Sequence, residues 1–203
     1  KFINSFKKDV DRKYKVLITK FAKTLTHPRR EEETSLGNLI ADAFAQRAGS
    51  DVVLIGSGSI RIKKMGPLVT LKDLLTCFPY DDSLRQYQIN GQALKKIFTH
   101  IMRIDNRDGE GECYQTNRGV QAIYNDKKKK LISLTINGQK VKNEKIYTLC
   151  LQGYHVKSAP DYLNISHEEL LGLGEEKIIT TSAQQVLEEY LRNHQNLTSQ
   201  VGK

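Results

Sequence analysis

The sequence predicts an α+β (mixed α/β) domain in which helices pack on a mixed sheet with antiparallel hairpins. Three observations favour this class. Amphipathic helical stretches alternate with short apolar runs typical of strands. An Asn-Gly pair joins two of those runs, as in a β-hairpin. Hydrophobic residues make up 38% of the 203 residues, which is enough for one sizeable core.

The N-terminal residues predict a polar helix followed by a strand. The helix is expected over Phe6–Tyr14, and Lys15–Leu25 alternates in part as a strand does. We assign residues 1–25 to a linker helix and first strand that come from a missing N-terminal domain, and residues 26–203 to the domain itself. The charged stretch His27–Glu33 reads as a connection.

The next segment predicts a helix laid on a core and then a buried strand. Thr34 or Ser35 is a suitable N-cap, and Gly49 is a suitable C-terminal stop. The strand is expected at Val52–Ile55. The apolar stripe of the helix consists of Leu36, Leu39, Ile40, Ala43 and Phe44.

Local capping signals predict two more helices. Thr70 with Asp73 is a variant capping box for a short helix, and Ser182 with Gln185 has the same spacing before the last helix. Between them, Leu84–Gly91 reads as a strand that ends in an Asn-Gly turn.

The middle of the chain predicts a further helix and three strands. The helix covers Gln92–Met102 and the strands cover Val120–Tyr124, Leu131–Ile136 and Ile146–Leu151. The pair Asn137-Gly138 predicts a tight hairpin turn.

The net charge of +9 raises the question of nucleic-acid binding. Lysines and arginines are scattered, however, and the densest run, Asn125–Ile132, lies at a predicted hairpin tip. We therefore predict a solvated turn and no nucleic-acid partner, although the charge should attract an anionic ligand. No apolar run approaches the ~20 residues of a membrane span, so we expect no membrane span.

The sequence contains no recognisable catalytic or metal-binding motif. It lacks a nucleophile elbow, a P-loop and a His-Glu-x-x-His sequence. The five histidines are far apart and are expected at the surface. Of the three cysteines, Cys77 and Cys150 are expected in the core, and their spacing fits no zinc site. We predict no catalytic residue, metal ion or other cofactor in this chain.

The stretch Ile55–Arg61, "IGSGSIR", leaves a predicted buried strand through small residues. One interpretation is a flexible surface loop. The other is a loop kept bare so that a ligand can approach its backbone, with Arg61 at the rim.

Several motifs in sequence order resemble the C-terminal domain of the 5′-nucleotidases. The family string is Arg-x-x-Glu, then Leu-Gly-Asn-Leu-Ile-x-Asp-Ala, then Asn-Gly-Gly-Gly-Ile-Arg, then Leu-Pro-Phe. This chain has "RREEETSLGNLIADAF", "GSGSIR" and "CFPY" in the same order, and the likeness continues more weakly to Tyr162. The resemblance implies the fold of that domain.

The resemblance implies a division of work between two domains. An N-terminal metallophosphatase domain holds two divalent metal ions and cleaves the ester, and the C-terminal domain binds the base and ribose. The metal-site signatures Asp-x-His and Gly-Asn-His-Glu/Asp are absent here. The chain is therefore expected to be the substrate-binding half, with that N-terminal domain and a nucleotide or nucleoside as its partners.

The resemblance also implies an arginine-lined glycine loop. Arg30 and Arg61 match family arginines on the ribose–phosphate side of the ligand. Gly58 matches a glycine where the backbone approaches the ligand. The family asparagine that recognises the base is replaced by Gly56, for which Ser57 is only a partial substitute.

An aromatic clamp is the other implied feature. Tyr80 and Tyr154 match the two rings that sandwich the base, and Asp161 matches, with an offset of one residue, an aspartate that binds ribose hydroxyls. Pro160 stands where the family has glycine, so a divergent pocket is expected.

The function that follows is nucleotide or nucleoside binding within a 5′-nucleotidase-like phosphoric ester hydrolase, the isolated chain being non-catalytic. The family implies a secreted, periplasmic or cell-surface location. The alternative is a surface binding module with altered specificity, for a sugar phosphate or a glycan.

Overall fold

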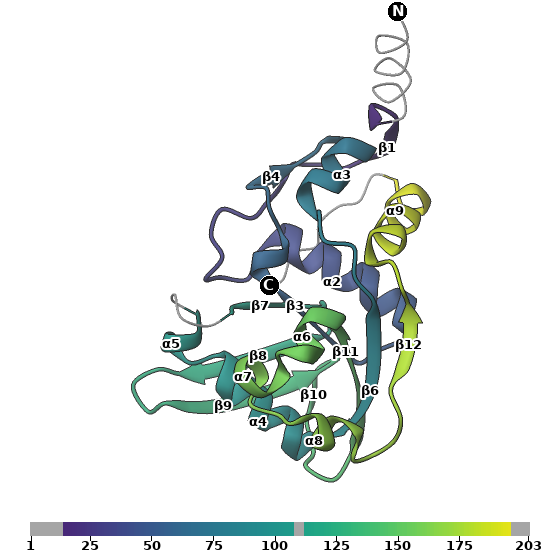
Figure 1. Cartoon of the computed structure of the whole chain (residues 1–203). Coiled ribbons are helices and arrows are strands. Elements are labelled where there is room, and N and C mark those ends of the chain that lie inside the picture. The colour runs from purple at the N-terminus through teal and green to yellow at the C-terminus, as the bar shows by residue number, and fades with distance from the viewer. Residues whose placement is uncertain (1–13, 108–111, 196–203) are drawn as a thin grey trace, which may run out of the picture.

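The structure is a computed structural model that describes residues 14–107 and 112–195. A mixed sheet runs through its centre, with helices and a hairpin on its two sides (Figure 1). The neighbouring strands β11 and β3 are parallel, and the other neighbours are antiparallel. The sheet order is β12 (Lys177–Thr180), β6 (Leu84–Asn90), β11 (Ile146–Gln152), β3 (Val52–Gly56) and β7 (Tyr114–Thr116). The predicted α+β class is confirmed.

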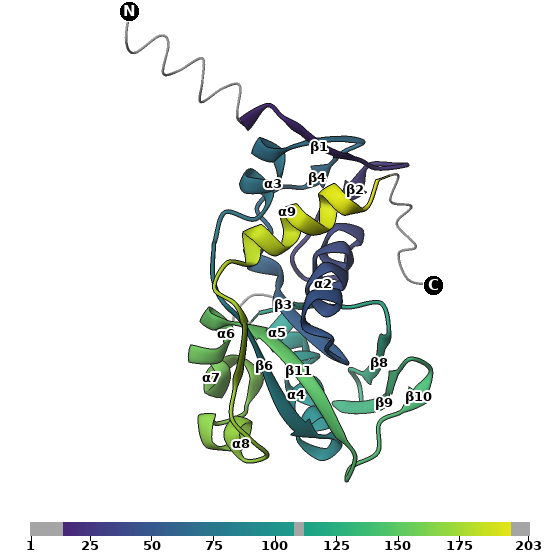
Figure 2. The same cartoon turned by 90° about the vertical axis from the view of Figure 1, so that its right-hand side faces the viewer.

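Strand β3 separates two hydrophobic cores because its side chains alternate between the faces of the sheet. Val53 and Ile55 face a core closed by α2 (Ser35–Ala48), α3 (Leu71–Cys77) and α9 (Ala183–Asn193). Val52 and Leu54 face a second core closed by α4 (Gly91–Ile101). Figure 2 shows α2, α3 and α9 together in the upper half of the molecule and α4 in the lower half, beside β6 and β11.

The second core is completed by short elements and a hairpin. The hairpin consists of β8 (Val120–Asn125) and β9 (Lys130–Ile136), extended by β10 (Gln139–Lys140). The predicted turn is confirmed, since Asn137 and Gly138 both have positive φ. The short helices are α5 (Ile104–Arg107), α6 (Gly153–Lys157), α7 (Ala159–Leu163) and α8 (His167–Leu171).

The first described strand belongs to the same packing unit as the rest. β1 (Leu17–Lys20) pairs with β5 (Leu68–Thr70), and β2 (Leu25–Thr26) pairs with β4 (Lys64–Met65). Phe21 lies in the first core and is fully buried. No gap in packing therefore separates these strands from the rest at residue 26. The predicted N-terminal helix lies mostly outside the described residues.

Most predicted helix ends are confirmed because their signals are local. Thr34 caps α2 by accepting from the Gly37 N–H, and Gly49 ends that helix at φ 61°. The capping box of Thr70 and Asp73 is present in both directions.

One turn prediction is wrong. Asn90 does not turn the chain back; it caps α4 by accepting from the Ala93 N–H, so Gly91 begins a helix. An Asn-Gly pair serves either purpose, and the amphipathic run that follows decides in favour of the helix.

Candidate ligand-binding site

Loops that carry most of the predicted site residues meet at one edge of the central sheet. The parallel strands β11 and β3 end side by side, with Leu151 opposite Leu54. The antiparallel neighbours β6 and β7 begin at the same edge, since Leu84 pairs with Gln152 and Tyr114 with Gly56. In open α/β sheets a ligand binds beyond the carboxyl ends of parallel strands, so this edge is the natural place for a site.

The glycine loop is the link from β3 through the short helix η1 (Ser57–Ser59) to Arg61. Its two glycines have different neighbours. A Cβ atom on Gly56 would lie 2.5 Å from Cε1 of the His155 ring. A Cβ atom on Gly58 would instead approach the Glu112 carboxylate at 3.2 Å. Gly56 therefore makes room for a protein side chain, whereas Gly58 faces the tip of a flexible one.

His155 is buried behind the glycine loop and helps to hold it. Its Nε2 accepts from the Gly56 N–H at 3.2 Å, and its Nδ1 lies 3.1 Å from the Tyr114 hydroxyl. An accepting Nε2 requires the neutral ring with the proton on Nδ1. Burial lowers the pKa of His155 to about 4, against an opposing effect of the Asp82 carboxylate. The prediction that the histidines lie at the surface is wrong for His155 and for His27, which are both buried.

A buried network supports the loop from below. Gln115 donates through Nε2 to Ser57 Oγ at 2.6 Å and accepts at Oε1 from the Thr34 N–H at 2.8 Å. The Thr34 hydroxyl in turn lies 2.9 Å from His27 Nδ1. Ser57 is fully buried, so its side chain stabilises the loop and is not presented to a ligand. The expectation that Ser57 partly replaces the missing asparagine is therefore wrong.

Tyr80 and Tyr154 are carried by segments that are hydrogen bonded to each other. The Tyr154 N–H donates to Asp82 Oδ2 at 2.6 Å, and the Gly153 N–H donates to the Ser83 carbonyl at 2.9 Å. The rings remain available, with 49% of Tyr80 and 55% of Tyr154 exposed. The structure thus brings both tyrosines to the edge where the glycine loop lies.

Each tyrosine has a neighbour that orients it. The Arg61 guanidinium lies over the Tyr80 ring at 5.4 Å, and Arg61 also donates to the Gly58 carbonyl at 3.2 Å. The Tyr154 ring stands edge-on to His155 with centroids 5.2 Å apart. Tyr154 also interacts with the Tyr162 hydroxyl and raises its pKa. Tyr80 therefore has a cationic neighbour, whereas Tyr154 has aromatic ones.

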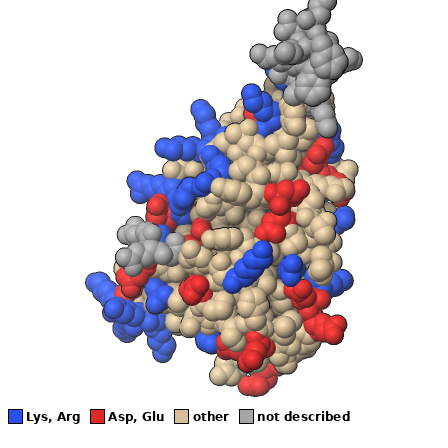
Figure 3. Space-filling view, in the orientation of Figure 1, with Lys and Arg blue, Asp and Glu red and all other residues tan. Residues whose placement is uncertain are grey.

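Glu112 is a member of this group that the sequence did not single out. Its Oε1 accepts from the Gly58 N–H at 2.7 Å. Burial raises the pKa of Glu112, while that backbone bond and the positive charges of Arg30 and Arg61 act in the opposite direction. Arg30 is exposed, and its positive charge is felt by the Glu112 carboxylate. Figure 3 shows Lys and Arg gathered along the left-hand side of this view of the molecule.

Asp161 and Arg30 are two predicted site residues for which the described part of the structure shows no hydrogen bond or ring contact with the glycine loop. Asp161 is the farther removed in its contacts. It is exposed in the first turn of α7, and its backbone hydrogen bonds His100 of α4. Asp82 makes the contact with the Tyr154 segment instead. Asp82 could not be predicted as a contact from the sequence. It is the second residue of the acidic pair after Tyr80, and nothing in that pair distinguishes it from a solvated residue.

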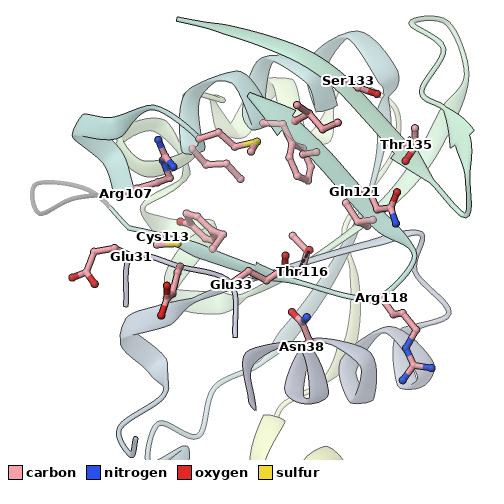
Figure 4. Close-up of a pocket in the computed structure, with 18 residues that line it drawn as sticks. Glu31, Glu33, Asn38, Arg107, Cys113, Thr116, Arg118, Gln121, Ser133 and Thr135 are labelled. Atoms are coloured by element: carbon pink, nitrogen blue, oxygen red, sulfur yellow. Dashed lines mark hydrogen bonds between the residues drawn. The ribbon is translucent and has the colours of Figure 1, made fainter. Parts of the chain in front are cut away.

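A separate cavity of about 630 Å³ lies between α4 and the β8–β9 hairpin. Figure 4 shows hairpin residues Gln121, Ser133 and Thr135 on one side, with Glu33 and Asn38 on the other. Arg107 Nε and Thr135 Oγ1 are buried there without a hydrogen-bond partner. The cavity is lined by none of the predicted site residues.

Two further observations concern the residues that the structure describes. Among them, no group of His, Cys, Asp and Glu is arranged to hold a metal ion, and no helix is long and apolar enough to cross a membrane. Cys77 and Cys150 are buried and free, as expected for core residues.

Comparison with known proteins decides the family. A model described as "5′-nucleotidase, C-terminal domain" matches residues 11–163. This chain belongs to the 5′-nucleotidase C-terminal domain family. The resemblance predicted from the ordered motifs is confirmed, and with it the fold of that domain.

Curated 5′-nucleotidases are similar over part of their length. The protein of Vibrio parahaemolyticus is 25% identical over 167 residues, which are 81% of this chain and 28% of the relative. The snake venom 5′-nucleotidase of Macrovipera lebetinus is 28% identical over 128 residues, which are 55% of this chain and 31% of the relative. This 5′-nucleotidase C-terminal domain therefore spans less than a third of the relatives it matches.

Solved structures of low sequence identity share the fold. A 5′-nucleotidase precursor from Thermus thermophilus superposes with a TM-score of 0.76 at 15% identity, covering 98% of this chain and 41% of that one. The NAD nucleotidase of Haemophilus influenzae gives 0.75 at 16% identity, covering 97% and 39%. A sulfate thiohydrolase from Thermus thermophilus gives 0.69 at 16% identity, covering 96% and 36%. The same fold thus occurs in proteins named for different substrates.

Proposed function

We propose that this domain binds the nucleoside part of a nucleotide for a 5′-nucleotidase-like metallophosphoesterase. The observation that carries the proposal is the convergence of Tyr80, Tyr154 and the glycine loop at the carboxyl ends of β3 and β11. Two half-exposed rings at one edge suit a flat heterocycle, and stacking on aromatic rings contributes about 1–3 kcal/mol per base.

The arginines are proposed to face the ribose–phosphate side of the ligand. Arg61 is fixed by its contacts with Gly58 and Tyr80, which hold its planar fork of donors in place. The charge of Arg30 acts on the Glu112 carboxylate, which is bonded to that loop. Asp161 stays a proposed ribose contact that would need the α7 segment to approach the ligand.

The chemical step is proposed to belong to a preceding domain. Two divalent metal ions in that domain would supply Lewis acid and activated water, while this domain binds and orients the substrate. Hydrolysis of a nucleotide to nucleoside and phosphate is accordingly proposed for the parent protein, not for this chain. An extracellular or periplasmic location is proposed with it, supported by the venom relatives.

Calorimetry on the 203-residue chain tests the proposal. Adenosine, guanosine and AMP are titrated, with ribose 5-phosphate and a neutral oligosaccharide as alternative ligands. We expect nucleoside binding that weakens in Tyr80→Ala and is kept in Tyr80→Phe, which retains the ring. Heat with the oligosaccharide or the sugar phosphate alone would favour a binding module of altered specificity and would contradict nucleoside recognition.

A further inference from the structure

The Glu112 carboxylate lies directly against the floor of the candidate site. It accepts from the Gly58 N–H at 2.7 Å, and its two oxygens lie 3.2 and 3.3 Å from the place of a Cβ on Gly58. The carboxylate carbon is 3.0 Å from the place of a Cβ on Gly56. The atoms nearest to the place of a Cβ on Gly58 all belong to Glu112, so Glu112 has the position from which a side chain can meet a ligand at Gly58.

Charged and phenolic groups surround Glu112. The positive charges of Arg61 and Arg30 act on its carboxylate. The charge of Glu112 acts in turn on Tyr162, as does Tyr154. Arg61 also lies over the ring of Tyr80. In the proposed binding mode, a flat ring that stacks on the tyrosines and turns one edge toward Gly58 would meet Glu112, because the Glu112 carboxylate accepts from the Gly58 N–H.

Hydrogen bonds to the backbone of Glu112 and of the next residue fix the position of Glu112. The Glu112 carbonyl accepts from Asn106 Nδ2 at 2.7 Å, and Asn106 is buried. The next residue, Cys113, accepts at its carbonyl from the Ser57 N–H at 2.8 Å, which continues the pairing of β7 with β3. Glu112 is thus held by Asn106 at its own carbonyl, by the loop through the carbonyl of the next residue, and by Gly58 at its carboxylate.

An ionised carboxylate can only accept hydrogen bonds, and it has about four lone-pair positions on two oxygens. Gly58 uses one of them. The remaining positions can receive a pair of adjacent N–H donors. Guanine offers such a pair at N1 and N2, inosine offers N1 alone, and adenine offers an acceptor at N1.

We propose that Glu112 is the residue that determines base specificity, and that it selects a base edge with adjacent N–H donors, as in guanine. The inference rests on the proposed nucleoside function and names its substrate class. It supplies a base-reading side chain in a loop where Gly56 has none.

The test is calorimetry of the 203-residue chain with guanosine, inosine and adenosine. The wild-type chain should bind guanosine about tenfold more tightly than adenosine, with inosine between them, as one well-placed pair of hydrogen bonds discriminates between bases. In Glu112→Gln, which keeps an acceptor for Gly58, the preference should shrink to about twofold or less. Glu144→Gln, the same change on an exposed turn, should leave the preference intact.

The possible results separate this inference from the proposed function. Equal binding of guanosine and adenosine by the wild-type chain would overturn the inference alone. So would a Glu112→Gln variant that weakens all three nucleosides by the same factor. No binding of any nucleoside would overturn the proposed function, and the inference with it.

Discussion

The glycine-loop edge and the cavity beneath the β8–β9 hairpin differ in how their polar groups are satisfied. At the glycine loop, the buried Gln115, His155 and Ser57 are all hydrogen bonded. In the network beneath them, only His27 Nε2 has no hydrogen-bond partner among the described residues. In the cavity of about 630 Å³, Arg107 Nε and Thr135 Oγ1 are buried without a partner. The cavity has the volume of a ligand site, whereas the edge has a prearranged set of donors, acceptors and rings.

The origin of the two regions explains this contrast. The edge is formed by four strands whose registers are fixed by continuous pairing, so loops far apart in sequence meet in one arrangement. The cavity lies where a hairpin covers α4 from outside the central sheet. Groups that are already in place reduce the free energy spent on ordering side chains when a ligand binds. We therefore propose that the ligand binds at the glycine-loop edge. The following predictions contrast the two regions.

The largest expected effect is the pH dependence that His155 gives to stability. Its pKa of about 4 in the folded chain lies below the usual value of 6.5. Between those two values the unfolded state binds more protons, so the free energy of unfolding should fall as pH decreases from 6.5 to 4. The loss due to this residue should be up to about 3 kcal/mol.

Urea unfolding of the wild type and His155→Gln at pH 7, 5.5 and 4 measures this effect. The difference between the two proteins isolates His155 from His27, whose pKa burial also lowers. A gap between them that stays constant with pH would show that His155 is not buried in its neutral form.

The next effect concerns the two glycines of the loop. Gly56→Ala should destabilise the chain by about 2 kcal/mol, because the new methyl group meets the His155 ring with no room to move. Gly58→Ala is the matched control, since it meets only the Glu112 carboxylate, and should cost less than about 1 kcal/mol. Equal costs measured by urea unfolding would contradict the packing role of Gly56.

Ligand affinity should separate the edge from the cavity. Tyr154→Ala should weaken nucleoside binding about tenfold, because it removes one stacking ring. Thr135→Val, which replaces an unpartnered hydroxyl in the cavity with a methyl group, should leave affinity unchanged. The reverse pattern in calorimetry would move the ligand to the cavity.

The smallest predicted effect tests the guanidinium over Tyr80. Arg61→Lys keeps the charge and loses the guanidinium whose Cζ lies 5.4 Å from the Tyr80 ring centroid, so nucleoside affinity should fall about two- to fivefold. Arg192→Lys, on α9 in an ion pair with Glu188, is the control and should have no effect. Equal affinities for the two variants would show that the stack does not orient Tyr80.

Sequence reasoning succeeded where a signal is local. The caps at Thr34, Gly49 and Thr70, and the turn at Asn137, depend on residues a few positions apart. The ordered motifs gave the family, and so the fold. The turn predicted at Asn90 was wrong because an asparagine side chain suits a helix N-cap as well as a turn.

Two residues that contact the predicted glycine loop, Glu112 and His155, could not be predicted from local sequence signals. Glu112 lies in a polar run of the type "DNRDGEGE", and only the pairing of Tyr114 with Gly56 brings it to the loop. His155 is separated from Gly56 by 99 positions and meets it through the parallel pairing of β11 with β3. Strand register, which the sequence does not encode locally, determines these contacts.

The most direct test of the account is a crystal structure of this chain with guanosine bound. We expect the base between Tyr80 and Tyr154, with its N1 and N2 edge toward Glu112. A base seated against Thr135 in the hairpin cavity, or electron density for guanosine away from both tyrosines, would contradict the assignment of the ligand to the glycine-loop edge.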